Sequence, residues 1–494
     1  MPQETATPQE TAGRTRETLV AGVDSSTQSC KVVIRSLETG KVMRTGRAAH
    51  PVGTEIDPEE WWRALQAAVR DAGGLADVAA ISIGGQQHGL IALDSAGRVI
   101  RPALLWNDTR SADAARDLIQ EVGAEAFATR TGSVPVASFT IAKLRWLADN
   151  EPQNAARIAA IALPHDWLTW RLRGFGPQNP TLDQLVTDRS DASGTGYFEA
   201  TTDVYDRDLL NIALRLPADH ADSEIVLPLV LNPAEKRSVE HESPEFPSWL
   251  VVGAGAGDNA AAALGLDAHP GDVIVSIGTS GTVFGVTETP GRDASGTVAG
   301  FADAAGAHLP LIATLNAARI LDSIASLLGV DHNELGRLAL EAEPGSDGLV
   351  LVPYFEGERT PNLPDATASL TGMTLGSTTR PNLARAAIEG MLCALADGLD
   401  AVRANGLIAE RLLLIGGAAQ NPAVALIASQ VFDLPVSLPE PGEYVALGAT
   451  RQAAWALTGK RPTWTVSVSA APASDFHRII RDQYRMAAAT VQPA

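Results

Sequence analysis

Short apolar runs alternate with small polar turns where the ordered part of the chain should begin. An apolar stretch at 19–23 ends at Asp24, and a turn rich in Ser and Thr follows it. Apolar positions resume at 31–37 and, after a second turn, at 41–49. Strand-length runs joined by short polar turns are typical of antiparallel hairpins. The sequence therefore predicts three consecutive strands here.

A helix is predicted next. Asp57 can accept hydrogen bonds at its first turn, and Pro58 suits its first position. Apolar residues then recur at helical spacing until Gly73-Gly74, which should end the helix. The run VAAISIGG at 78–85 is predicted as a buried strand. The first hundred residues therefore have the predicted order β-β-β-α-β.

The second half of the chain repeats this order. Residues 272–286 again suggest strand, small polar turn and strand, residues 381–404 a long helix, and residues 411–417 a buried strand entering a glycine turn. The repetition predicts two duplicated α/β halves with a cleft between them, and a boundary near 245–255. The expected division is a disordered tail at 1–17, a first domain at 18–250 and a second at 251–494.

Charge and composition narrow the possible functions. The chain has 494 residues, and 38 Lys+Arg against 58 Asp+Glu give a net charge of −20, which disfavours nucleic-acid binding but leaves small anionic ligands open. Neither an apolar run of about 18 residues nor a signal-peptide core occurs, so we expect no membrane span and no secretion. With only Cys30 and Cys393, no disulfide framework is expected, and the reducing cytoplasm is the predicted location.

Asp258 follows a run of glycine and alanine that leads into an alanine-rich helix. It could be an ordinary helix cap, or it could be a carboxylate that a substrate can approach closely, as a general base requires. The frame Gly255/Gly257/Ala260 matches a dinucleotide-binding pattern, but the helix is too short for a βαβ crossover, so we reject that interpretation. No Walker-type phosphate loop occurs.

Polar groups gather at the ends of several predicted strands. The turns at 25–29 and 278–282 are rich in small hydroxyl residues and glycine, which suits phosphate oxygens, although most such turns are only turns. Asp24, beside the first turn, offers hard oxygen ligands for Mg²⁺. The segments 84–89 and 106–108 supply amide, imidazole, indole and carboxylate groups, a mixture that suits a sugar or polyol.

Taken together, these segments resemble the FGGY family of carbohydrate kinases over about 19–458. Single matches are weak, but eleven occur in family order. The matching segments are GVDSSTQSCKVV, EIDPEEWW, GGQQHG, RPALLWND, LPHDWL, SDASGT, GAGDNAAAALG, SIGTSGTV, PYFEGERTP, LIGGAAQNP and EYVALGAT. There are departures: Ser26 stands where the family often has a glycine, and Ala418 replaces the third glycine of a GGG turn.

The resemblance implies a fold of two ribonuclease-H-like, actin-related domains and assigns roles to individual residues. It implies that Asp258 is the catalytic base and that Asp24 holds Mg²⁺ through water. The positions implied to contact nucleotide phosphates are Thr27, Ser29, Lys31 and Thr279. Those implied to hold the adenosine are Gly416, Gly417 and Asn421. The implied sugar-binding positions are Gln87, His88, Trp106, Asn107, Asp108 and Asn259.

The expected activity is transfer of phosphate from ATP to a pentulose, with D-xylulose as first choice and its 5-phosphate as product. The alternatives are a related kinase for ribulose, L-xylulose or a pentitol, and, more remotely, a non-enzymatic actin-like ATPase or sugar sensor. The expected partners are these small molecules alone, with a homodimer left open.

Overall fold

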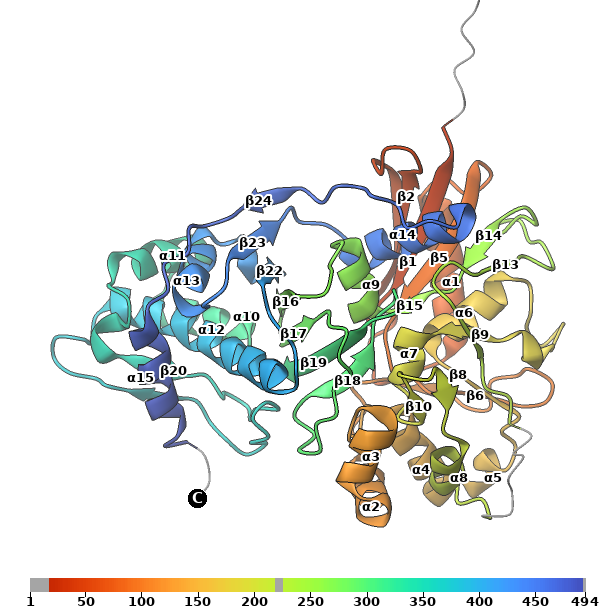
Figure 1. Cartoon of the computed structure of the whole chain (residues 1–494), viewed down its shortest axis with the longest axis horizontal. Coiled ribbons are helices and arrows are strands. Elements are labelled where there is room, and N and C mark those ends of the chain that lie inside the picture. The colour runs from red at the N-terminus through yellow and green to blue at the C-terminus, as the bar shows by residue number, and fades with distance from the viewer. Residues whose placement is uncertain (1–16, 218–224, 492–494) are drawn as a thin grey trace, which may run out of the picture.

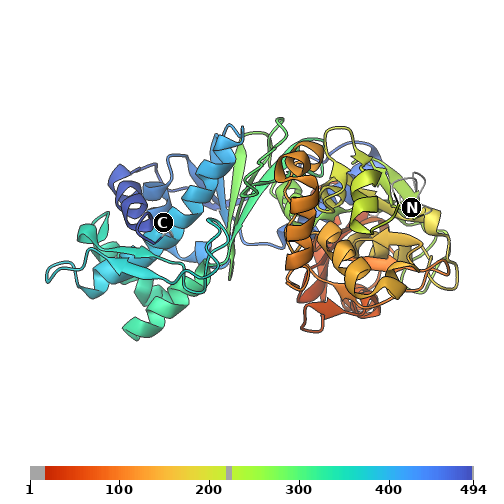
Figure 2. The ribbon, with the colours of Figure 1, turned by 90° about the horizontal axis from the view of Figure 1, so that it is seen from below.

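The computed structural model describes residues 17–217 and 225–491, which form two lobes side by side (Figure 1, Figure 2). The tail predicted at 1–17 lies outside the described residues except for Glu17. Each lobe is built on one sheet of seven strands. The fold is thus α/β with two sheets, as predicted.

The first sheet has the order β13-β14-β5-β1-β2-β3, with β15 also paired to β5. Strands β1, β2 and β3 form antiparallel hairpins, whereas β5 and β14 run parallel to β1. The bounds are β1 (Leu19–Ser25), β2 (Ser29–Ser36), β3 (Val42–Ala49), β5 (Val78–Gly85), β13 (Lys236–Ser238), β14 (Val251–Gly253) and β15 (Ala256–Gly257).

The second sheet repeats this arrangement, with the order β18-β19-β17-β16-β22-β23-β24. Its hairpin strands β16, β17 and β19 are antiparallel, and β22 and β23 run parallel to β16. The predicted duplication is confirmed at the level of strand order and direction. The bounds are β16 (Asp272–Ile277), β17 (Gly281–Gly285), β18 (Ala299–Ala302), β19 (His308–Thr314), β22 (Arg411–Ile415), β23 (Val436–Pro439) and β24 (Val468–Ala470).

Helices cover both sheets. In α1, the Asp57 side chain accepts a hydrogen bond from Glu59 N at 3.1 Å, as expected of a cap. The helices that precede the second sheet along the chain are α1 (Pro58–Asp71), α2 (Ala112–Val122), α3 (Ala124–Thr131), α4 (Thr140–Asn150), α5 (Pro152–Ala155), α6 (Pro164–Leu172), α7 (Arg189–Ser193), α8 (Arg207–Ala213) and α9 (Asp258–Gly265). Those that follow are α10 (Ala318–Leu328), α11 (His332–Glu341), α12 (Arg380–Ala404), α13 (Pro422–Val431), α14 (Tyr444–Thr458) and α15 (Arg478–Ala488).

Short strand pairs complete the two lobes. They are β4 (Glu55–Ile56) with β7 (Ala103–Leu104), β6 (Ile91–Leu93) with β8 (Ala160–Ala162), β9 (Val186–Asp188) with β12 (Leu229–Leu231), β10 (Phe198–Glu199) with β11 (Val204–Tyr205), and β20 (Val350–Val352) with β21 (Ser369–Thr371). Among the described residues, no helix is both long and apolar enough to cross a bilayer.

The boundary predicted near 245–255 falls inside the first sheet. β14 follows that point and pairs with both β5 and β13, so the chain passes to the second sheet only between α9 and β16. Late in the chain, α14 returns to the first lobe and packs against β1, β5 and α9 (Figure 1). A Cβ atom at Gly448 would lie 1.8 Å from Ala261 O, so only glycine permits this close helix contact. The sequence analysis predicted neither the place of β14 in the first sheet nor the return of α14 to the first lobe.

Candidate active site

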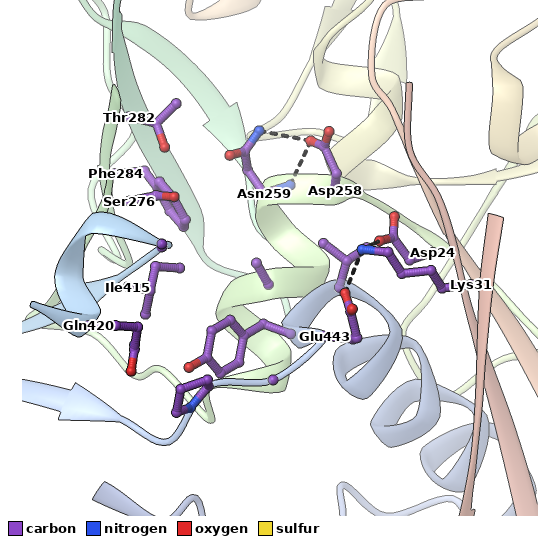
Figure 3. A pocket seen from close by; sticks show the side chains of 17 residues that line it. Asp24, Lys31, Asp258, Asn259, Ser276, Thr282, Phe284, Ile415, Gln420 and Glu443 are labelled. Carbon is purple, nitrogen blue, oxygen red and sulfur yellow. Dashed lines mark hydrogen bonds and ion pairs between the residues drawn. The ribbon is translucent and has the colours of Figure 1, made fainter. Parts of the chain in front are cut away.

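A cavity of about 800 Å³ lies where the two sheets face each other (Figure 3). Its wall combines residues from β1 and β2, the start of α9, the end of β22 and the start of α14. Six of the residues singled out from the sequence line it: Asp24, Lys31, Asp258, Asn259, Gly416 and Gly417. Residues separated by almost 400 positions therefore meet in one site. Thr282, from the predicted phosphate turn at 278–282, also lines it. The lining residues that the sequence did not single out include Ser276, Phe284, Gln420, Glu443 and Tyr444.

Asp258 begins α9 at the cavity wall and stays partly accessible to solvent. Its Oδ1 accepts hydrogen bonds from Asn259 N at 2.7 Å and from Asn259 Nδ2 at 2.8 Å. Its other oxygen accepts none from the described residues. Burial raises the pKa of Asp258 to about 7, the Asn259 backbone N–H opposes this, and nearby Asp24 adds to it. This carboxyl group can thus exchange a proton near neutral pH, as a general base must.

Asp24 and Lys31 face each other on β1 and β2, because the strand register pairs them. Lys31 Nζ lies 3.4 Å from Asp24 Oδ2 and 2.5 Å from Glu443 Oε2 (Figure 3). Burial raises the pKa of Asp24 to about 6, and Lys31 opposes that rise. Asp24 Oδ1 is buried with no hydrogen-bond partner among the described residues. An unpaired carboxylate oxygen at the cavity wall fits the water shell of a Mg²⁺ ion.

A second cavity of about 430 Å³ adjoins the first and shares Gly417 and Gln420 with it. Thr279 and Asn421 line this cavity. Asn421 Oδ1 caps α13 by accepting from Ala423 N at 3.0 Å, and its Nδ2 donates to His332 O at 2.7 Å. Asn421 is therefore a fixed part of the wall. The walls carry Ile277, Ala318 and Leu321 on the apolar side, and Asp322, His332 and Asn333 on the polar side.

Comparison with known proteins identifies the family. The N-terminal domain model of the FGGY family of carbohydrate kinases matches residues 19–265, and the C-terminal domain model matches residues 273–457. The chain belongs to the FGGY family of carbohydrate kinases. The two matches meet between α9 and β16, where the chain also changes sheets.

Several relatives of this FGGY kinase are similar along most of their length. The xylulose kinase of Streptomyces coelicolor is 46% identical over 90% of this chain and 89% of its own. The xylulose kinase of Streptomyces rubiginosus is 45% identical over the same shares. The crystal structure of xylulose kinase from Bifidobacterium adolescentis superposes with a TM-score of 0.90 at 46% identity, covering 96% of this chain and 99% of that one.

In this FGGY kinase, the first polar turn contributes less to the cavity than the sequence suggested. Thr27 Oγ1 accepts from Trp106 Nε1 at 2.9 Å and donates to Gln86 Oε1 at 3.4 Å. Ser29 is 2% exposed. Neither Thr27 nor Ser29 lines either cavity, whereas Lys31 on the following strand lines the first.

Of the predicted sugar-binding residues, Gln87 and His88 lie in different surroundings. Gln87 Oε1 accepts from Asn259 Nδ2 at 3.5 Å. His88 lines a third cavity of about 320 Å³ between the lobes. Its Nδ1 lies 2.6 Å from Gly194 O and donates to it, which leaves Nε2 as an acceptor. Burial, with a smaller contribution from Lys143, lowers the pKa of His88 to about 3, so the ring is neutral.

Asp108 and Asn107 differ in whether their side-chain oxygens already accept hydrogen bonds. Asp108 Oδ2 accepts from Thr54 Oγ1 at 2.8 Å, and Oδ1 accepts from Arg110 Nε at 2.8 Å. Burial would raise the pKa of Asp108, but these bonds hold it below its ordinary value. Asn107 Oδ1, by contrast, is buried without a partner among the described residues. Of the two side chains, that of Asn107 has the freer acceptor for a ligand hydroxyl.

Proposed function

We propose that this FGGY kinase transfers the γ-phosphate of ATP to the terminal hydroxyl of D-xylulose, giving D-xylulose 5-phosphate. The proposal rests on one geometric observation: Asp258 presents an unpaired carboxylate oxygen to a cavity that both halves of the chain line. The choice of sugar is supported by the two Streptomyces xylulose kinases, which are 45% and 46% identical to this chain. The buried free cysteines Cys30 and Cys393 favour a reducing cytoplasm as its place of action.

The cavity residues divide the work of phosphoryl transfer. Asp258 accepts the proton of the attacking hydroxyl, and Asn259 in the same wall orients the sugar beside it. Gln87 and His88, which lie outside this cavity, would complete the sugar site. Lys31 offers a positive charge toward the phosphates, while Gly416 and Gly417 let the nucleotide approach the backbone closely. The second cavity, of about 430 Å³, would take the nucleoside. A Mg²⁺ ion, held by Asp24 through water, would neutralise phosphate charge when bound.

A substrate panel tests this proposal. Initial rates with ATP would be measured for D-xylulose, L-xylulose, D-ribulose and xylitol, with phosphorus NMR locating the phosphate on the product. We expect the highest kcat/KM for D-xylulose, with phosphate on O5. A higher kcat/KM for one of the other three would change the assigned substrate but leave the assigned kinase activity in place. If the protein hydrolyses ATP but phosphorylates none of the four, the proposed function is rejected.

A further inference from the structure

Four ionisable side chains lie fully enclosed behind the loop that carries Asp258. His165 and Asp166 come from α6, Asp188 from the end of β9 and Asp191 from α7. None of the four is more than 3% exposed. His165 and Asp166 fall within the family-like segment LPHDWL, and Asp191 falls within SDASGT, but no ligand-facing role was predicted for any of the four. Burial raises the pKa of Asp166 to about 6 and that of Asp191 well above its ordinary value, so each buried carboxylate must be either compensated or protonated.

His165 supplies that compensation because both of its ring nitrogens face carboxylates. Nδ1 lies 3.3 Å from Asp166 Oδ1, and Nε2 lies 3.2 Å from Asp188 Oδ1 and 3.5 Å from Asp191 Oδ2. Burial would lower the pKa of His165, but the three carboxylates raise it to about 10. With a carboxylate near each ring nitrogen, we take the ring to be an imidazolium, although Nδ1 makes no hydrogen bond among the described residues.

A metal ion is the competing way to compensate these charges, since His165, Asp166 and Asp191 each offer a ligand atom within 4.8 Å of the others. Asp188 is not one of these three residues. Its Oδ2 accepts from Ser190 N at 2.8 Å and from Ser190 Oγ at 2.6 Å, and its Oδ1 accepts from Asp191 N at 3.0 Å. Asp188 is thus held by three protein donors, and an assay for bound metal distinguishes an ion at the other three groups from a charged His165.

The cluster is connected to the loop of Asp258 through Ser190. Ser190 Oγ, which donates to Asp188, accepts a hydrogen bond from Gly257 N at 3.0 Å. Gly257 immediately precedes Asp258 and is the N-cap of α9. The His165 ring also supports the loop from behind, because a Cβ on Gly255 would lie 2.9 Å from His165 Cε1. A chain of contacts thus runs from His165 through Asp188 and Ser190 to the backbone that aims the carboxylate.

We infer that His165 and Ser190 are positioning residues for Asp258: the charged ring orders Asp188, Asp188 orients the Ser190 hydroxyl, and that hydroxyl holds the Gly257 N–H so that Asp258 faces the substrate. The inference rests on the proposed role of Asp258 as base. A displacement of about 1 Å at a reacting group can cost about 100-fold in rate. Loss of the Ser190 hydroxyl should therefore be visible in kcat.

The matched pair Ser190→Ala and Ser193→Ala tests the connection. Both hydroxyls are buried on α7, but Ser193 Oγ accepts from Ala302 N at 2.9 Å instead of from the Asp258 loop. Rates would be expressed per active site, counted by titration with a fluorescent ADP analogue. We expect Ser190→Ala to lower kcat about 10–100-fold with ADP affinity unchanged, and Ser193→Ala to stay within about threefold. Equal losses in the two variants would overturn the inference.

A double-mutant cycle separates action through Asp258 from a parallel effect. If Ser190 acts by aiming Asp258, Ser190→Ala should lower kcat no further in an Asp258→Asn background. If Ser190→Ala lowered kcat in the Asp258→Asn background by the same factor as in wild type, the connection would be contradicted. The proposed function fails separately, when the wild-type protein does not phosphorylate D-xylulose. The Ser190 comparison can then still be made with any sugar that the wild type phosphorylates.

The charge on His165 is tested by His165→Gln and His165→Lys, with His308→Gln as the control for losing a buried histidine. We expect His165→Gln to lower kcat as Ser190→Ala does, and His165→Lys to recover at least a tenth of wild-type kcat. Equal kcat in the Gln and Lys variants would contradict the role of the charge. So would a stoichiometric metal in the purified wild type that His165→Gln loses. If His165→Gln does not fold, the Ser190 pair decides the matter.

Discussion

The two sheets share strand order and direction but carry different chemistry at matching positions. Asp24, the second-last residue of β1, pairs with Lys31 across the hairpin. Ser276, the second-last residue of β16, pairs in the same way with Thr282. All four side chains line the same cavity. A duplicated backbone thus places an ion pair on one side of the cleft and two hydroxyls on the other.

This difference suggests a division of labour between the lobes. The first sheet presents every charged group that we assign to catalysis, including Asp258 at the start of α9. The second sheet presents hydroxyls, glycine backbone and an adjoining cavity, where we propose that the nucleotide binds. Strand ends recur as ligand sites in α/β folds because backbone groups and turns converge there. The repeated fold provides two sets of strand ends that could bind a ligand. The different side chains on the two sets give the lobes different roles.

The largest expected effect comes from removing the proposed base on the first lobe. Asp258→Asn preserves shape but cannot accept the proton, so kcat should fall about 10²–10⁴-fold. Affinity for ADP, measured by calorimetry, should change little because the second lobe supplies most of that site. Turnover close to wild type would remove Asp258 from the mechanism.

The matched positions on the two sheets should respond unequally to substitution. Hydrogen bonds to charged groups contribute about 1.5–3 kcal/mol and neutral ones about 0.5–1.5 kcal/mol. We expect Asp24→Asn to lower kcat about 10–100-fold and to raise the Mg²⁺ concentration needed for half-maximal rate. Ser276→Ala should cost about 2–10-fold, with no change in Mg²⁺ requirement. Equal losses, with an equal Mg²⁺ requirement, would mean that the two sheets are not specialised in this way.

Proton uptake by the first lobe should shape the pH profile. With a pKa of about 7, Asp258 is mostly protonated at pH 6. Below pH 6, kcat/KM should therefore fall about tenfold for each further pH unit. Because the folded pKa lies above the ordinary 3.8, the folded state binds this proton more tightly than the unfolded state. The buried charge therefore costs stability as pH rises from about 4 to about 7. Denaturant unfolding should show Asp258→Asn gaining stability over wild type across that window; a constant difference would contradict the raised pKa.

Two adjacent glycines on the second lobe give the smallest effects and separate folding from binding. Gly416 has a φ of +100°, and a Cβ there would lie 2.4 Å from Ile277 O, so Gly416→Ala should destabilise the fold by about 1–3 kcal/mol. At Gly417 no atom lies within 4 Å of the added Cβ. Gly417→Ala should keep the melting temperature and weaken ADP binding a few-fold. The reverse pattern would mean that Gly417 does not face the nucleotide.

The local elements of this fold could be predicted because their signals lie in short stretches of sequence. β5 spans Val78–Gly85, the bounds expected from its apolar run, and α12 begins one residue before the predicted start. Asp258 stood out because glycine and alanine surround it. Such features depend on neighbours in the chain, which a sequence displays directly.

The rest depends on contacts between distant residues. Nothing near α14 indicates that it packs on the first sheet, since the close approach of Gly448 to Ala261 involves residues 187 positions apart. The bond from Trp106 to Thr27 and the pairing of Asp108 with Arg110 likewise depend on how side chains meet. The cluster around His165 joins three separate elements and left no periodic pattern to detect.

The central claim is that one substrate site spans both lobes, with the sugar beside the first and the nucleotide on the second. Calorimetric titration of a non-hydrolysable ATP analogue, with and without saturating D-xylulose, tests this most directly. Ligands that meet in one cleft should stabilise the same arrangement of the lobes, so coupling of about 1–3 kcal/mol is expected, with one analogue bound per chain. The analogue should therefore bind about 5–150-fold more tightly when the sugar is present. Identical affinity in the two titrations would contradict a shared site between the lobes.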